Sequence, residues 1–389
     1  MSTVAVDTSR LRYPRRSVRQ IMGQVMLALI PGTMLYAWLV DERVLFNIAA
    51  AVVASLFMEA AFIALRKRPV PATLSDGSII LAAWLLALCV PASLPLWQLI
   101  VGVFVMTGLG KHLFGGLGHN PFNPAMVAYA VLLVSFPVSM TDWQIPANAD
   151  GRQSMGITAD PTHSDSEAQD ASTSTLVSGT NDHTYSTDWD AVTGATALDR
   201  LREVRIDYRT ASMRGVPPAS SAAENHAVDS RLIERDEYRL LASELIVPSV
   251  WMWVNLAWLA GGIYLLFIRI ITWHIPVSVL ITVTAVYLTY ALTSSATVMP
   301  LSAALLSGAV IFGAFFIATD PVSAATSSQG KLIYGAGIGL LTVVIREFSS
   351  YPEGFAFAVL LMNICVPLID HVLTRSTLPA SGPSGKSGT

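Results

Sequence analysis

Cysteine is scarce in this sequence of 389 residues. Its two cysteines, Cys89 and Cys365, both lie inside apolar runs. That placement excludes a disulfide framework and a four-ligand metal site built from this chain alone. We therefore expect no metal site here, and any iron–sulfur or zinc centre would have to come from a partner subunit.

Charged residues are also few. They make up 13% of the chain, whereas an ordinary soluble domain has about a quarter. Hydrophobic residues account for 53%, and the mean hydropathy is +0.54. This composition excludes an ordinary soluble protein and indicates a protein of the lipid bilayer. No feature of the sequence indicates nucleic-acid binding.

Long apolar runs follow one another along the chain. A bilayer core of roughly 30 Å needs about 20 mostly apolar residues per helix. By that criterion the sequence predicts an all-α polytopic membrane protein with about ten transmembrane helices. The predicted spans are 21–40, 44–65, 77–91, 96–111, 124–140, 248–270, 275–293, 299–318, 331–349 and 354–373.

One long polar segment separates two groups of five spans. The predicted organisation is an N-terminal arm (1–20), a first membrane half (21–140), a polar loop (141–247), a second membrane half (248–373) and a C-terminal tail (374–389). The loop holds 18 of the 27 acidic residues and 9 of the 24 lysines and arginines. The membrane part is therefore basic and the loop acidic.

Basic residues determine the predicted orientation. They cluster before the first span and after the second, at Arg10, Arg12, Arg15, Arg16, Arg19, Arg66, Lys67 and Arg68. Because cytoplasmic connections carry an excess of Lys and Arg, both places are assigned to the cytoplasm. Lys111 then also falls on the cytoplasmic side, and Arg346 on the opposite one. Five crossings put loop 141–247 outside, and ten crossings return the C-terminus to the cytoplasm.

The two halves contain similar strings. Residues 128–137 read Ala-Tyr-Ala-Val-Leu-Leu-Val-Ser-Phe-Pro, and residues 356–365 read Ala-Phe-Ala-Val-Leu-Leu-Met-Asn-Ile-Cys. Halves with an odd number of helices are related by inverted topology if they are repeats. We therefore predict two inverted five-helix halves. The alternative is that apolar helices resemble one another by chance.

A short motif in the loop carries cofactor chemistry. Residues 190–196 read Asp-Ala-Val-Thr-Gly-Ala-Thr, which resembles the flavin-transferase recognition motif. In that motif, which includes Asp190, Thr193, Gly194 and Ala195 here, the last hydroxyl is joined to the phosphate of FMN. The predicted attachment point is therefore Thr196. The alternative is an ordinary helix cap with Thr193 or Thr196 as the N-cap residue.

Longer strings resemble a known family, the D subunit of the Rnf electron-transport complex, and more distantly the B subunit of the sodium-pumping NADH:quinone oxidoreductase. The strings are Arg15-Arg-Ser-Val18, Lys111-His-Leu-Phe-Gly-Gly-Leu-Gly-His-Asn-Pro-Phe-Asn-Pro-Ala125, Ala318-Thr-Asp-Pro-Val322, Gly330-Lys-Leu-Ile-Tyr-Gly-Ala-Gly-Ile-Gly339, Tyr351-Pro-Glu-Gly-Phe-Ala-Phe-Ala-Val-Leu-Leu-Met-Asn363 and Val366-Pro-Leu-Ile-Asp370. Two departures are Ala197, where the family more often has Pro, and an unusually long insertion before the motif.

The resemblance implies a subunit of an ion-translocating oxidoreductase in the bacterial inner membrane, inactive alone. Such a complex couples electron flow between NADH and ferredoxin to Na⁺ or H⁺ movement. The chain would carry FMN on Thr196 as a phosphoester and relay electrons. Its implied partners include an extracytoplasmic flavoprotein and iron–sulfur subunits. Related subunits also hold a non-covalent riboflavin, for which no residues are assigned.

Two acidic residues are candidates for an ion pathway. Glu59 lies well inside the predicted second span, where an ionisable group costs several kcal/mol unless it is paired or hydrated. Asp320 lies at the end of span eight and is more easily hydrated. The alternative for Glu59 is an interhelical brace or a carboxylate that reaches water from a shallower depth.

The connection between spans four and five is rich in Gly and Pro. Irregular backbone at membrane depth is tolerated only where it is buried in protein or lines a cavity. A hairpin at half-membrane depth, with Gly116, Asn120 and Asn123 as candidates, and a plain cytoplasmic turn are both open. In the second half, Tyr351-Pro-Glu-Gly354 is the preferred matching element over Thr319-Asp-Pro321.

Two functions of other classes compete with the redox relay. Two inverted five-helix halves also describe a passive solute channel or transporter. The other competing function is that of a membrane scaffold whose flavin motif is vestigial. The Asp190–Thr196 motif disfavours a channel, which needs no flavin attachment, and the presence of flavin discriminates against a scaffold.

Overall fold

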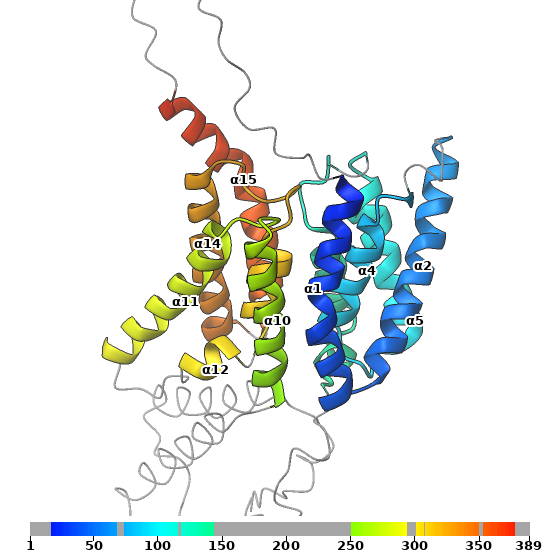
Figure 1. Ribbon diagram of the computed structural model, residues 1–389, viewed down its shortest axis with the longest axis horizontal. Helices are drawn as coiled ribbons and strands as arrows, with labels where there is room; N and C mark the ends of the chain where they lie inside the picture. The colour runs from blue at the N-terminus through cyan, green and yellow to red at the C-terminus, as the bar shows by residue number, and fades with distance from the viewer. Residues whose placement is uncertain are drawn as a thin grey trace, which may run out of the picture.

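The computed structural model describes residues 17–67, 74–115, 118–143, 250–293, 301–306, 308–349 and 353–377. All regular structure in these ranges is helical (Figure 1). Five helices are long and apolar enough to cross a membrane: Val18–Leu39, Arg43–Leu65, Val250–Phe267, Ser328–Phe348 and Phe355–Leu373. The prediction of an all-α, multi-pass membrane protein is confirmed at this level. The number of crossings and the inverted relation of the halves stay predictions.

The first half of the chain forms one helical bundle. Its elements are α1 (Val18–Leu39), α2 (Arg43–Leu65), α4 (Ser78–Cys89), α5 (Leu96–Val105), the π-helix η1 (Met106–His112), α6 (Pro124–Ser135) and α7 (Pro137–Thr141). Helix α1 begins at a capping box, in which the Ser17 hydroxyl accepts from the Gln20 amide and the Gln20 side chain accepts from the Ser17 amide.

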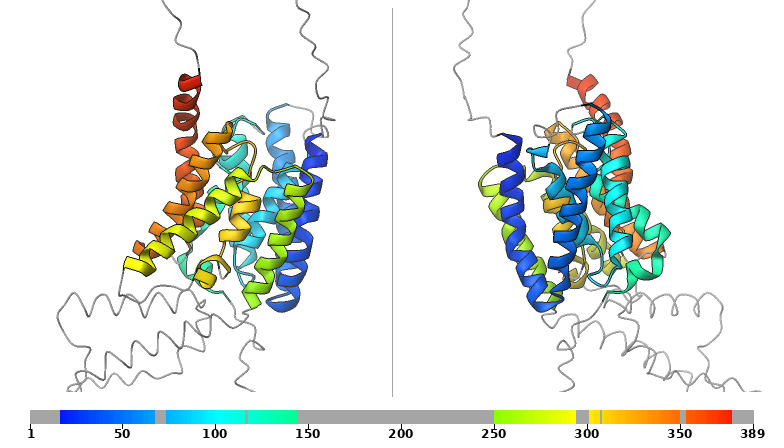
Figure 2. Two further views of the ribbon diagram at one scale, coloured as in Figure 1. Left: turned by 60° about the vertical axis from the view of Figure 1, so that its left-hand side comes forward. Right: turned by 90° about the vertical axis from the view of Figure 1, so that its right-hand side faces the viewer.

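The second half forms a bundle beside the first (Figure 2). Its elements are α10 (Val250–Phe267), α11 (His274–Thr293), α12 (Leu301–Leu306), α13 (Val310–Phe312), the π-helix η2 (Gly313–Ile317), α14 (Ser328–Phe348) and α15 (Phe355–Thr377). Helices α1 and α10 pack against each other, and so do α6 and α15. These pairs join the two halves.

Three of the predicted spans are not single α-helices, which corrects the boundaries drawn from hydropathy. Span 96–111 changes from α5 to the π-helix η1 at Met106. Span 124–140 is interrupted at Phe136, directly before Pro137, and continues as α7. Span 299–318 is divided among α12, α13 and η2. A hydropathy profile does not show such changes because it depends on residue types and not on the pattern of backbone hydrogen bonds.

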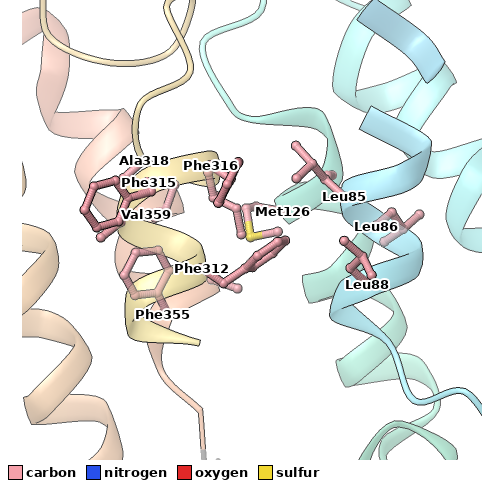
Figure 3. Packing of buried hydrophobic residues seen from close by; sticks show 14 of the residues in the cluster. Leu85, Leu86, Leu88, Met126, Phe312, Phe315, Phe316, Ala318, Phe355 and Val359 are labelled. Carbon is pink, nitrogen blue, oxygen red and sulfur yellow. The ribbon is translucent and has the colours of Figure 1, made fainter. Parts of the chain in front are cut away.

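Buried apolar side chains from the two bundles meet in one core. Figure 3 shows Met126 of α6 between Leu85, Leu86 and Leu88 of α4 on one side and the aromatic side chains of the second half on the other. Those aromatic residues are Phe312, Phe315, Phe316 and Phe355, and each is at most 5% exposed. The core therefore fixes the second half against the first.

Close approach of α1 and α10 depends on glycine. A Cβ atom built on Gly261 would overlap the backbone oxygen of Ala28, which cannot move without bending α1. We therefore expect Gly261→Ala to lower the free energy of unfolding by about 1–3 kcal/mol, as overpacking does in cores. Thermal unfolding of the purified protein in detergent measures this.

The matched control for that prediction is Gly23→Ala in α1. A Cβ on Gly23 meets no atom within 4 Å, so alanine adds only its better helix propensity. Gly23→Ala should leave the unfolding midpoint unchanged or raise it. Equal midpoints for Gly261→Ala and wild type would show that the two helices can separate without cost.

Candidate functional site

The flavin-attachment motif lies outside the described residues. Asp190, Thr193, Gly194, Ala195 and Thr196 all fall between residues 143 and 250, and Gly116 of the candidate hairpin falls in a second gap. The assignments to these residues stay predictions. The structure does describe Trp143 and Trp251, which stand near the two ends of that long gap.

Glu59 lies in a fully buried ion pair. Its side chain, on α2, has 0% exposure, and its Oε1 is 2.7 Å from the Lys111 ammonium of η1. The His112 Nε2 lies 3.1 Å from the other carboxylate oxygen. The Lys111 ammonium also donates to the Ser78 hydroxyl at the start of α4, at 3.0 Å. Side chains of α2, η1 and α4 thus meet at the Lys111 ammonium.

The pairing supplies what a buried carboxylate requires. Removing a single charge from water costs several kcal/mol, which a close partner of opposite sign and further hydrogen bonds offset. The orientation rule assigned Lys111 to the cytoplasmic side, but its side chain is 4% exposed. The contacts are those of an interhelical brace. An ion path through Glu59 would additionally require the Lys111 ammonium to move away.

The π-helix η1 places Lys111 and His112 side by side in the interior. Both residues are in its last turn, and both are buried. Gly110 in the same turn allows close packing, since a Cβ there would lie 2.8 Å from the Pro124 Cα. π-Helical turns occur frequently at functional sites, so the distorted backbone is itself a site signal that hydropathy could not show.

The segment after η1 has two buried asparagines. Asn120 and Asn123 are each 4% exposed, whereas the neighbouring His119 is exposed. Asn123 caps α6 by accepting from the amides of Ala125 and Met126, and its side-chain nitrogen lies 3.4 Å from the Ile317 carbonyl. The Asn120 amide nitrogen donates to the Phe122 carbonyl at 2.9 Å.

The part of the second half that meets this segment is the end of η2. Ile317, at the end of η2, supplies the carbonyl that faces Asn123. Asp320 is half-buried three residues later and accepts from the Ser323 hydroxyl at 2.8 Å. The carbonyl that faces Asn123 therefore lies two residues before segment 319–321, and the choice between 351–354 and 319–321 as the matching element stays open.

A second buried charge pair joins α14 to the residues before α15. Arg346 is 4% exposed, forms an ion pair with Glu353 and donates to the Ala304 carbonyl at 2.8 Å. Gly308 leaves room for the pair, because a Cβ on it would overlap the Glu353 Oε1. In the sequence Arg346 served only as an orientation marker, and its pairing with Glu353 was missed.

Sequence comparison shows the family of this chain. Residues 6–378 match the family described as NQR2, RnfD, RnfE. This chain belongs to that family. A relative from Citrobacter koseri is 39% identical over 367 residues, which cover 94% of this chain and 96% of the relative. Relatives from Escherichia coli strain K12 and Shigella dysenteriae are 39% and 38% identical with the same coverage. All three are named as the D subunit of an ion-translocating oxidoreductase complex.

Membership of the NQR2, RnfD, RnfE family confirms the resemblance inferred from the strings at 111–125 and 351–363. The first string contributes Lys111, Asn120 and Asn123 to the buried sites described above, and the second contributes Glu353. The strings that carried the resemblance therefore also contribute residues to the polar interior of this chain.

Proposed function

We propose that this protein is the D-type membrane subunit of an ion-translocating oxidoreductase complex. The observation that carries the proposal is the near full-length similarity to relatives of that name, 39% over 94% of this chain and 96% of theirs. The helices long and apolar enough to cross a membrane and the buried charges of the described bundles support it. The chain acts in a multisubunit complex rather than alone.

The proposal includes a covalent flavin on Thr196. When bound, FMN supplies electron transfer, which the side chains of the motif do not provide themselves. Asp190 and Thr193-Gly-Ala195 match the recognised motif, in which small residues before the attachment point suit the approach of a transferase. Electrons would pass between NADH and ferredoxin through an extracytoplasmic flavoprotein and iron–sulfur subunits. A non-covalent riboflavin is the second cofactor that the family resemblance implies.

Replacing Thr196 with valine tests the flavin assignment. After co-expression with a flavin transferase, the denatured wild-type band on a gel should fluoresce, and the Thr196→Val band should lose its fluorescence completely. Valine keeps the shape of threonine but has no hydroxyl to form the phosphoester. Thr210→Val, in the same loop outside the motif, should fluoresce like wild type.

A dark wild-type band, with the transferase shown to be active on another substrate, would contradict the covalent flavin. The solute-channel and scaffold interpretations would then become the stronger ones, because neither needs flavin. A fluorescent Thr196→Val band would place the attachment on another hydroxyl.

We further propose that Glu59 and Asp320 serve ion translocation. Glu59 offers a carboxylate inside the first bundle, and Asp320 offers a half-buried one three residues after Ile317, whose carbonyl faces Asn123 of the first half. Carboxylates within the membrane are typical of ion and proton paths. Coupled ion uptake by variants at Glu59, argued in the Discussion, tests this part.

A further inference from the structure

The Lys111 ammonium stands between two carboxylates that come from different elements. It donates to the Glu59 Oε1 of α2 at 2.7 Å and to the hydroxyl oxygen of Ser78, the first residue of α4, at 3.0 Å. The Ser78 hydroxyl in turn donates to the Asp76 Oδ1 at 2.7 Å. A single hydroxyl group therefore connects the ammonium to the second carboxylate.

The turn before α4 holds the Asp76 carboxylate in place. Its Oδ1 also accepts from the Ser78 amide, at 2.8 Å. Gly77 between them has a φ of +74°, a left-handed conformation that glycine adopts without steric cost, and a Cβ on it would lie 3.7 Å from Met22 of α1. Helix α4 also packs against α2, beside which it lies in Figure 1. Asp76 is half-buried, so this carboxylate is more exposed than the buried Lys111.

Both oxygens of Glu59 already face a basic group. Lys111 bonds to Oε1, and the His112 Nε2 lies 3.1 Å from Oε2. A metal cation can therefore bind at Glu59 only if the ammonium withdraws, and a proton that neutralises Glu59 removes the anionic partner of the ammonium. A buried ammonium without an anionic partner is strongly unfavourable, and the Ser78 hydroxyl is neutral. The displaced ammonium needs a second carboxylate.

We infer that Asp76 receives the Lys111 ammonium when the coupling ion occupies Glu59. The inference rests on the proposed role of Glu59 in ion translocation and adds the residue that makes room for the ion. Lysine has a flexible four-carbon stem, so its ammonium can shift by about one hydrogen-bond length while the backbone of η1 stays in place. A carboxylate can accept about four hydrogen bonds, so the two from Ser78 do not fill Asp76.

Every charge in this exchange keeps a partner of opposite sign. With the ion absent, Lys111 pairs with Glu59, and with the ion present, the ion pairs with Glu59 and Lys111 with Asp76. Two further basic groups border the site: His112 beside Glu59, and Arg66, which donates to the His112 carbonyl. A protonated His112 repels the ammonium and so favours its withdrawal toward Asp76.

The variant Asp76→Asn tests the exchange. Asparagine keeps an oxygen for the Ser78 amide and hydroxyl but has no charge to receive the ammonium. In proteoliposomes with the whole complex, the ion concentration for half-maximal coupled uptake should rise about tenfold, a usual size for coupled sites. Uptake per electron at saturating ion should stay near wild type. Titrating Na⁺ at fixed pH and pH at fixed Na⁺ distinguishes a metal cation from a proton, and the shift should appear in the titration to which wild type responds.

Asp41→Asn is the matched control. The Asp41 Oδ1 accepts from the Arg43 amide at 2.8 Å, so it makes the same kind of turn before α2 that Asp76 makes before α4. Asp41→Asn should leave the half-saturating concentration unchanged. Asp76→Glu keeps the charge and should restore most of the loss.

A Lys111→Gln background separates the exchange from a direct attraction between Asp76 and the arriving ion. Glutamine has an amide that can still donate to Glu59 and Ser78, but it has no charge that must move. In that background Asp76→Asn should have no further effect on the half-saturating concentration. Such non-additivity is the sign of two residues that act through one another.

The outcomes separate this inference from the proposed function. Normal coupled uptake by Glu59→Gln overturns the ion path and the exchange together. Loss of uptake in Glu59→Gln with a wild-type half-saturating concentration in Asp76→Asn overturns the exchange alone, and so does an equal shift with Lys111 and with Lys111→Gln. A shift that requires Lys111 and is reversed by Asp76→Glu supports both.

Discussion

Replacing Lys111 with methionine should lower the free energy of unfolding by about 3–5 kcal/mol, the usual cost of removing one partner of a buried ion pair. Methionine fills much of the same space, so the loss is electrostatic. Glu59, at 0% exposure, would have only His112 and no ammonium beside it. The measurement is the fraction of monodisperse protein that survives heating in detergent.

Two further variants serve as controls for this prediction. In Glu59→Gln/Lys111→Met both charges are gone, and such replacements of buried pairs are often neutral or stabilising. The double variant should therefore be more stable than Lys111→Met alone. Lys67→Met, at an exposed position just beyond the end of α2, should change stability by no more than about 0.5 kcal/mol. A Lys111→Met protein as stable as Lys67→Met would show that the pair contributes nothing.

Helix positions were predictable because each helix that crosses a bilayer needs an apolar run of fixed length. The runs at 21–40 and 44–65 became α1 and α2 with ends shifted by at most three residues. The π-helices η1 and η2 were not predictable in this way. Apolar content does not separate α-turns from π-turns, and the close contacts of Gly110 and Gly313 with Pro124 and Phe355 are visible only in the structure.

Only some residues of the buried polar sites could be predicted from the sequence. An acidic residue inside an apolar run marked Glu59, but its partner Lys111 lies 52 residues away in sequence, and no local pattern joins the two. Arg346 and Glu353 are only seven residues apart. They were missed because a charge near a predicted span end is read as an orientation signal, although close packing buries it.

The stripe of Trp251, Asn255 and Trp258 on α10 was not recognised in the sequence, although its pattern is present there. Its spacing places two indoles and an amide on one helix face, a polar interruption in a run that is otherwise apolar. What the sequence did not show is which side chains lie next to this stripe. Phe312 of α13 and Phe355 of α15 line the same pocket as the stripe, and the packing of the second bundle brings them there.

In the reconstituted complex, Glu59→Gln should abolish ion uptake coupled to electron transfer while electron transfer itself continues. Glutamine keeps the size of glutamate but cannot bind a proton, and it lacks the charge that holds a cation. Proteoliposomes containing the whole complex allow ion uptake and electron transfer to be measured on one sample. The expected result is a fall in ions taken up per electron to near zero.

Ion uptake would also be lost if Glu59 were only a structural brace and Glu59→Gln distorted the bundle. The double variant distinguishes a brace from an ion-path residue. Glu59→Gln/Lys111→Met leaves no unpaired charge at the site, so its fold should be intact by the heating assay. A stable double variant that still takes up ions in normal proportion to electrons would show that Glu59 only braces α2 against η1. A stable double variant without uptake would assign the carboxylate to the ion path, with Lys111 as the cation that an arriving ion must replace.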